Sequence, residues 1–194
     1  PGVVIAASDG SYDSRSDVAA FGHAFRWCRR SRGGLASLER VEEKAGQAVG
    51  HNSNINEAEA EGAADVLRCV CARLRHIQRW GGTRVRLVVL LVDSQWVCDG
   101  VMECGSPRAE SILRIRDHML FMHGRFGGVR FALVKVPSHI SEPCDDDQPD
   151  PEGCMYLNEC ADGEATAARK RAEASISEGL DPGFSVREVH FRTT

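Results

Sequence analysis

The amino-acid sequence predicts an α/β fold, a mixed β-sheet with helices on both of its faces. Three observations lead to this prediction. The first fifty residues carry strand-like runs, whereas from residue 57 apolar side chains recur at helical spacing. Residues 85–92 and 129–136 are almost continuously apolar, as in strands buried on both faces. Strands in direct succession indicate antiparallel neighbours, and strands separated by helices indicate parallel crossovers.

The N-terminal part of the chain predicts three strands. Residues 2–8 form an apolar run that ends beside Asp9, and residues 21–27 alternate in the pattern of a second strand. A third strand fits residues 38–49, after the turn-like segment 32–34. We therefore expect an antiparallel start to the sheet.

The rest of the chain alternates helices and strands. Apolar residues at helical spacing predict a helix from residue 57 to the glycine pair at 81–82, and the strand 85–92 then ends at Asp93. The other predicted elements are two helices, a strand and an alanine-rich helix: 94–102, 107–126, 129–136 and 158–176. The sheet thus has five strands, and residues 184–191 could add another.

Composition bounds the class of protein. The 194 residues suit one domain with an appendage, and 42% hydrophobic with 27% charged residues is globular. The net charge of -4 hides an acidic stretch at 141–152, and 21 of the 24 basic residues are arginines, so the charge permits a nucleic-acid partner. No apolar run is long enough for a membrane span or a signal peptide. We expect a soluble, intracellular protein, cytoplasmic or nuclear.

Eight cysteines are too few for a disulfide scaffold, and none forms a CxxC pair. Cys69 and Cys71 lie two apart on a predicted helix, where they face different directions. Four residues could be drawn as a zinc site, although their spacing matches no zinc module: His139, Cys144, Cys154 and Cys160. Reduced, mostly buried thiols are the favoured interpretation.

Three acids fall near one edge of the predicted sheet: Asp9 in the first strand, Glu59 in the first turn of the helix, and Asp93 at the end of the central strand. Each aspartate alone could simply cap its strand. Acids that converge at the carboxyl ends of strands repel one another unless cations neutralise them, and Mg²⁺ prefers carboxylate oxygens. The pattern therefore favours a metal site.

Five motifs follow one another in the order of the predicted elements: DGS at 9–11, NEAE at 56–59, DSQ at 93–95, VPSH at 136–139 and NECAD at 158–162. In order and spacing they resemble the ribonuclease H type 1 family. The resemblance is closest to the ribonuclease H domains of retroelement polyproteins, and it spans roughly residues 3 to 175.

The resemblance implies a ribonuclease H-like fold and a two-metal site. It assigns the metal ligands to Asp9, Glu59, Asp93 and Asp162, with His139 as a further catalytic residue on a loop beside them. The metal would be Mg²⁺, two ions, with Mn²⁺ able to substitute. Glu57 and Glu61 are alternatives to Glu59, but helical spacing turns both away from it. The positions that contact the substrate in the family match Gly10, Ser11, Asn56 and Gln95.

The function implied is a metal-dependent endonuclease that hydrolyses the RNA strand of RNA/DNA hybrids, leaving 5′-phosphate ends. We expect a catalytic domain over 1–176 with an acidic loop insertion at 141–153, and a tail over 177–194. A reverse transcriptase module in the same polypeptide would be its partner. The alternatives are a free-standing cellular ribonuclease H, an inactive nucleic-acid-binding or scaffold module of the same fold, and a DNA nuclease.

Overall fold

The computed structural model describes residues 2–31, 34–37, 43–51, 54–79, 84–103, 109–137 and 154–179. The predicted roles of His139, the insertion 141–153 and the possible strand 184–191 lie outside these residues. The strands are β1 (Gly2–Asp13), β2 (Val18–Ser31), β3 (Gly34–Ser37), β4 (Glu43–His51), β5 (Val85–Val92) and β6 (Arg130–Lys135). The helices are α1 (Ile55–Arg79), α2 (Gln95–Met102), α3 (Glu110–Arg125) and α4 (Cys154–Ser177).

The sheet is mixed, as the sequence predicts. Along the path β3, β2, β1, β5, β6 the first two pairings are antiparallel and the last two are parallel. Strand β4 also pairs with β2, along its residues 18–25, while β3 takes residues 28–31 of the same edge. Six segments therefore fill five positions across the sheet. The predicted third strand 38–49 corresponds to β4 at 43–51, and β3 at 34–37 is an additional strand that the sequence did not predict.

Strand β1 is longer than its apolar run, because β2 pairs with it from Gly2 to Asp13. The two strands are joined by a turn at residues 14–17, where Asp17 has a φ of 53°. The first strand therefore extends beyond its predicted end at residue 8, and Asp9 lies inside it. Helix α4 likewise begins four residues before the predicted start at 158.

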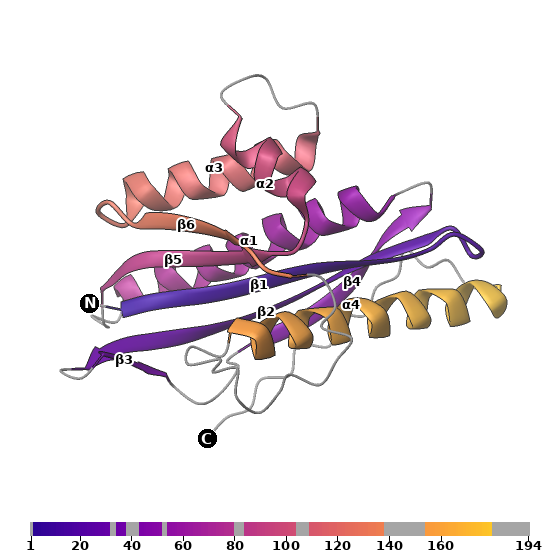
Figure 1. Ribbon diagram of the computed structural model, residues 1–194, viewed down its shortest axis with the longest axis horizontal. Coiled ribbons are helices and arrows are strands. Elements are labelled where there is room, and N and C mark those ends of the chain that lie inside the picture. The colour runs from indigo at the N-terminus through magenta and orange to yellow at the C-terminus, as the bar shows by residue number, and fades with distance from the viewer. Residues whose placement is uncertain are drawn as a thin grey trace.

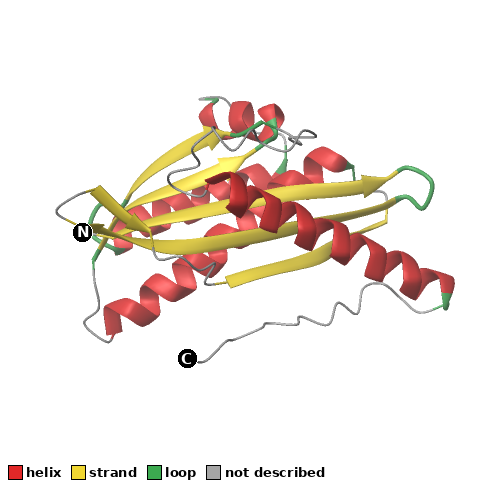
Figure 2. Ribbon diagram, turned by 60° about the horizontal axis from the view of Figure 1, so that its bottom comes forward, coloured by secondary structure: helices red, strands yellow, loops and turns green. Residues whose placement is uncertain are grey.

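Alternation along the strands creates two cores. Val4 and Ala6 of β1 face α1, α2 and α3, whereas Ile5 and Ala7 face α4. Figures 1 and 2 show this arrangement, with α4 on one face of the sheet and the other three helices on the opposite face. Each face of β1 is thereby buried, which explains the almost continuous apolar run of residues 3–7.

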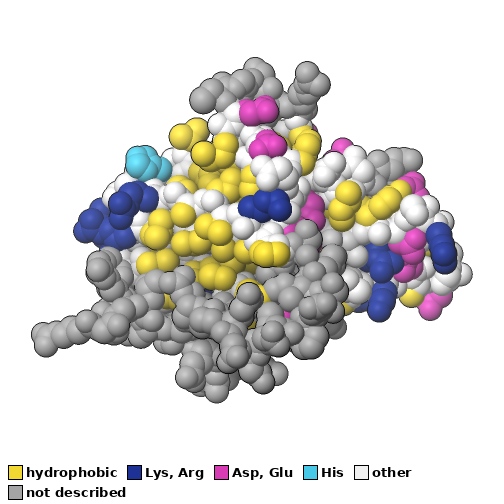
Figure 3. Space-filling view, viewed as in Figure 1, with side chains coloured by type: hydrophobic (Ala, Val, Ile, Leu, Met, Phe, Trp, Pro, Cys, Tyr) yellow, Lys and Arg dark blue, Asp and Glu magenta, His cyan; other side chains and the backbone are white. Residues whose placement is uncertain are grey.

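Helix α4 covers only part of its face. It packs on β1, β2 and β4, while hydrophobic side chains gather openly over β5 and β6 in Figure 3. Val134 of β6 is 41% exposed there. Among the described residues, helical cover on this face is thus concentrated on the strands that flank Asp9.

No helix in the described part of the chain is long and apolar enough to cross a membrane.

Close packing of α4 depends on glycines in the strands beneath it. Gly22 of β2 and Gly46 of β4 are register partners, and α4 backbone lies directly over both. A methyl group on Gly22 would collide with the carbonyl oxygen of Ala161 and the amide nitrogen of Ala165. The alanines on the facing side of α4 complete this contact: Ala161, Ala165, Ala168 and Ala172. Small residues on both sides therefore allow the helix to lie against the sheet.

This contact predicts the effect of a single methyl group. Gly22→Ala should lower the free energy of unfolding by at least about 2 kcal/mol, because the collision is with backbone that cannot rotate away. Gly163→Ala is the matched control on α4, since its methyl group would meet nothing within 4 Å. That change should leave stability equal or higher by about 0.5–1 kcal/mol through helix propensity. Urea unfolding of both variants tests the contact, and equal stability would contradict it.

Candidate metal centre

Asp9 and Asp93 lie side by side because β1 and β5 are parallel neighbours. Ser8 is the register partner of Val92, so the next residue of each strand is an aspartate. Asp93 directly follows the end of β5, and the hydroxyl of Ser94 then caps α2 by accepting from the amide of Val97. Asp9 is only 4% exposed. The parallel register thus brings together two carboxylates that are far apart in the sequence.

Glu59 joins them from α1. Its side chain is 5% exposed and lies against Gly10, where an added Cβ would be 3.0 Å from the Glu59 amide nitrogen and 3.1 Å from its Oε1. The absence of a side chain at Gly10 therefore lets the start of α1 approach β1. One carboxylate oxygen from each of Asp9, Glu59 and Asp93 lies within 4.8 Å of the others.

The cluster is electrostatically unfavourable without a cation. Burial, followed by the charges of Asp93 and Asp162, raises the pKa of Asp9 to about 7. Burial, followed by the charges of Asp93 and Asp9, raises the pKa of Glu59 to about 10. No salt bridge between described residues includes Asp9, Glu59 or Asp93. The three acids therefore either retain protons or require a positive charge from outside the protein.

The donors fit a hard divalent cation. Oε2 of Glu59 and Oδ1 of Asp93 are both buried and have no hydrogen-bond partner. Leaving buried carboxylate oxygens unpaired is costly, and oxygen-only clusters of this kind suit Mg²⁺ or Mn²⁺ better than Zn²⁺. The chemistry of the cluster thus agrees with the metal that the sequence motifs imply.

Asp162 approaches the three acids from α4, the helix on the other face of the sheet from α1. It follows Ala161, whose carbonyl lies over Gly22, and Gly22 is the register partner of Asp9. Its charge contributes to the raised pKa of Asp9, so the two carboxylates are in electrostatic contact. Asp162 does not belong to the group of three whose oxygens lie within 4.8 Å of one another. It therefore lies beside this group rather than within it.

The two alternatives to Glu59 are engaged elsewhere. The backbone amide of Glu57 donates to Asn54 Oδ1 at 3.0 Å, and the backbone amide of Asn54 donates to Glu57 Oε2 at 3.4 Å. This reciprocal pair is a capping box at the start of α1. Glu61 forms an ion pair with Arg114 of α3. Of the three glutamates, the structure thus places Glu59 at the aspartates.

The predicted substrate contacts surround the cluster unevenly. Gly10 touches Glu59, Asn56 is exposed in the first turn of α1, and Gln95 is exposed at the start of α2. The side chain of Gln95 donates to Asp99 Oδ1 at 2.7 Å. The hydroxyl of Ser11 instead accepts from Arg169 Nε of α4 at 2.9 Å.

Asn158 is a further candidate for the metal centre. It belongs to the NECAD motif but is not among the site residues predicted from the sequence. Its Oδ1 is buried without a hydrogen-bond partner, and it precedes Asp162 by four residues on α4. Residues at this spacing share one face of a helix. That spacing is the sequence signal that could have identified it.

The six described cysteines form no disulfide bond, but fewer are buried than predicted. Cys28 and Cys71 are buried, and four are partly exposed: Cys69, Cys98, Cys154 and Cys160. Of the residues that could be drawn as a zinc site, His139 and Cys144 lie outside the described part of the chain. This grouping therefore stays a prediction.

The fold is similar to solved ribonuclease H structures. The N-terminal ribonuclease H domain of a Mycobacterium tuberculosis protein, solved as a fusion with maltose-binding protein, matches with a TM-score of 0.54 and 17% sequence identity, over 89% of this chain and 99% of that one. Ribonuclease H1 from the halophilic archaeon Halobacterium salinarum matches with a TM-score of 0.49 and 20% identity, over 87% and 98%. No family model matches the chain, and no curated protein matches it. The chain has a ribonuclease H-like fold, which confirms the predicted fold class.

The raised pKa values predict how stability depends on pH. Both acids bind protons more tightly in the folded protein than in the unfolded chain, whose carboxyl groups titrate near about pH 4. Their protons therefore stabilise the fold fully below that pH. This stabilisation is lost as the pH rises toward about 7 for Asp9 and about 10 for Glu59. In EDTA, Tm should consequently fall between about pH 5 and about pH 8.5.

Asp93→Asn should flatten this dependence, because it removes a charge that raises both pKa values. Asp117→Asn, an exposed change on α3, should retain the slope of the unmodified protein. Adding Mg²⁺ at the higher pH should restore Tm. A Tm that rises with pH in EDTA would show that the acids are not mutually repelling.

Proposed function

We propose that this protein is a metal-dependent endonuclease that hydrolyses the RNA strand of RNA/DNA hybrids. One observation carries the proposal: three carboxylates meet where β5 ends beside β1, with two buried oxygens that lack partners. The ribonuclease H-like fold and the five sequence motifs support the same reaction, hydrolysis that leaves a 5′-phosphate and a 3′-hydroxyl.

The chain supplies ligands rather than a nucleophile. Asp9, Glu59 and Asp93, with Asp162 beside them, would hold two Mg²⁺ ions. Such ions, when bound, activate a water molecule and stabilise the leaving 3′ oxygen of an in-line displacement. Burial of Asp9 and Glu59 keeps water from competing for their oxygens, and ligation requires both to lose the protons that their raised pKa values retain. His139 would orient or relay protons near the attacking water, since an imidazole titrates near neutrality.

Recognition of the RNA strand would fall to residues around the cluster. Selection of RNA requires contacts to 2′-hydroxyl groups across a shallow minor groove. Asn56 precedes Glu59 by three residues and Gln95 follows Asp93 by two; both side chains are exposed and can donate or accept such bonds. The backbone of Gly10 adjoins the cluster, and Ser11, although it accepts from Arg169, keeps its own hydroxyl hydrogen to donate.

The proposal extends to the parent polypeptide. The VPSH and NECAD segments resemble those of retroelement ribonuclease H domains, so we infer that the chain belongs to a reverse-transcribing element, with a reverse transcriptase module that adds affinity through effective concentration. Sequencing the parent transcript tests this inference. An adjoining polymerase reading frame would support it, and an isolated open reading frame would favour the free-standing cellular enzyme.

Cleavage of labelled substrates tests the activity directly. With Mg²⁺ the protein should cut the RNA strand of a hybrid, should leave duplex RNA and duplex DNA intact, and should be inactive in EDTA. Asp93→Asn should reduce turnover by about 10² to 10⁴-fold, because losing a metal ligand removes several kcal/mol of transition-state stabilisation. Glu59→Gln should have a similar effect.

Two controls separate the site from the rest of the fold. Asp117→Asn changes one exposed charge on α3, and Glu57→Gln changes the neighbouring glutamate on α1 while a glutamine still serves its capping box. Both should cleave at the unmodified rate. Cleavage by Asp93→Asn at that rate would refute the metal site, and hybrid binding without any cleavage would identify an inactive binding module.

His139→Ala provides a separate prediction. Turnover should fall while Mg²⁺ binding, measured by calorimetry, remains, because the motifs place this residue outside the four acids. Loss of a stoichiometric metal site would instead make His139 a ligand. Unchanged turnover at all pH values would remove it from the mechanism.

A further inference from the structure

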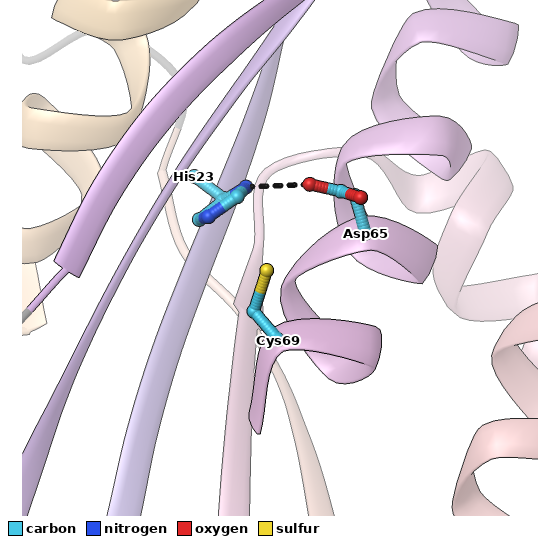
Figure 4. Close-up of side chains that lie close together, drawn as sticks. All are labelled: His23, Asp65 and Cys69. Carbon is cyan, nitrogen blue, oxygen red and sulfur yellow. Dashed lines mark ion pairs between the residues drawn. The ribbon is translucent and has the colours of Figure 1, made fainter. Parts of the chain in front are cut away.

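A second group of metal-ligating side chains lies between β2 and α1, apart from the acidic cluster. His23 of β2 faces Asp65 and Cys69 of α1, as Figure 4 shows. The Nδ1 of His23 is 3.2 Å from Asp65 Oδ2, and the candidate ligand atoms of all three residues lie within 4.8 Å of one another. Asp65 and Cys69 are four residues apart, so one face of the helix presents both of them to the histidine.

His23 is 1% exposed and pairs with Asp65 through Nδ1, but its Nε2 is buried without a hydrogen-bond partner. Ser8, its register partner on β1, also has a buried hydroxyl without a partner. A buried ring nitrogen in this state is costly, because it has lost water without a replacement. The site therefore lacks a group, such as a metal ion, that would bind the ring nitrogen.

Arg68 contacts the other two candidate ligands, Asp65 and Cys69, and orients them. Its Nε donates to Asp65 Oδ1 at 2.8 Å, which leaves Oδ2 directed toward His23. Its guanidinium also approaches Cys69 Sγ at 3.5 Å, a position that favours the thiolate. Outer partners of this kind commonly orient metal ligands. Arg68 is 43% exposed and Asp65 16%, so a cation can reach the group from their side of the helix.

We propose that His23, Asp65 and Cys69 form a binding site for Zn²⁺ that links β2 to α1. Zinc accepts imidazole, carboxylate and thiolate together, with bonds of about 2.0–2.3 Å and ligand atoms roughly 3.4–3.8 Å apart, so the three side chains need to move only slightly. The thiolate and carboxylate neutralise the ion, and a water molecule takes the fourth position. Thiolate and imidazole exclude Mg²⁺, so this site and the acidic cluster select different metals.

Cobalt titration of the metal-free, reduced full chain tests the site. Co²⁺ replaces Zn²⁺ in tetrahedral sites and gives a thiolate charge-transfer band together with visible absorption. The unmodified protein should develop both with one equivalent of Co²⁺, Zn²⁺ should bleach them, and excess Mg²⁺ should not. Zn²⁺ should also raise Tm. Cys69→Ala should lose the charge-transfer band and the Zn²⁺-dependent rise in Tm, and His23→Gln should bind Co²⁺ at least tenfold more weakly.

Cys98→Ala is the matched control, because Cys98 is another partly buried thiol packed against the same core. It should keep the band, and so should Asp93→Asn, which keeps failure of this site distinct from failure of the proposed nuclease. Circular dichroism confirms that each variant folds. Absence of a thiolate band in the unmodified protein would overturn the proposal without any variant. A band that survives Cys69→Ala would also overturn it, by assigning the metal to other cysteines.

Discussion

The parallel pairing of β1 with β5 is the interaction on which the candidate site depends. It sets Asp9 beside Asp93, and it makes β1 the strand that both helical layers cover. A shift of one residue in this register would turn one aspartate to the opposite face of the sheet. The alternating burial of β1 resists such a shift, because every apolar side chain would change layers as well. Core packing thus holds in place a pair of charges that repel each other.

Helix α1 connects the two clusters of potential metal ligands. Glu59, near its start, completes an oxygen-only group, and six residues later Asp65 begins a mixed group with Cys69 and His23. The small residues at the start of the helix, including Gly62 against Ser8 and Phe21, bring it close enough to the sheet for both contacts. If each group binds its metal, the part of α1 from Glu59 to Asp65 is anchored at both of its ends, and Glu59 is thereby held at the acids.

Most of the fold follows from periodicity. Helical spacing and buried apolar runs are local properties, so the order of elements and the mixed sheet were predictable. The extent of β1 was not, because Asp9 and Gly10 weaken the local strand signal while pairing with β2 continues through them to Asp13. The predicted strand 38–49 overlaps only β4, and the extra strand β3 precedes it, because both pair with the same edge of β2, which no local pattern contains.

The sequence by itself determined which residues could carry the chemistry, because the spacing of the motifs places acids at strand ends and in the first turn of a helix. Helical spacing and the motif also favoured Glu59 over its neighbours, but only the tertiary structure buried it against Gly10, since that contact depends on how α1 approaches the sheet. It also revealed the group around His23, which a reading of cysteine spacing missed. His23 and Asp65 are more than forty residues apart in the sequence, and the spacing of residues does not report a contact between a strand and a helix.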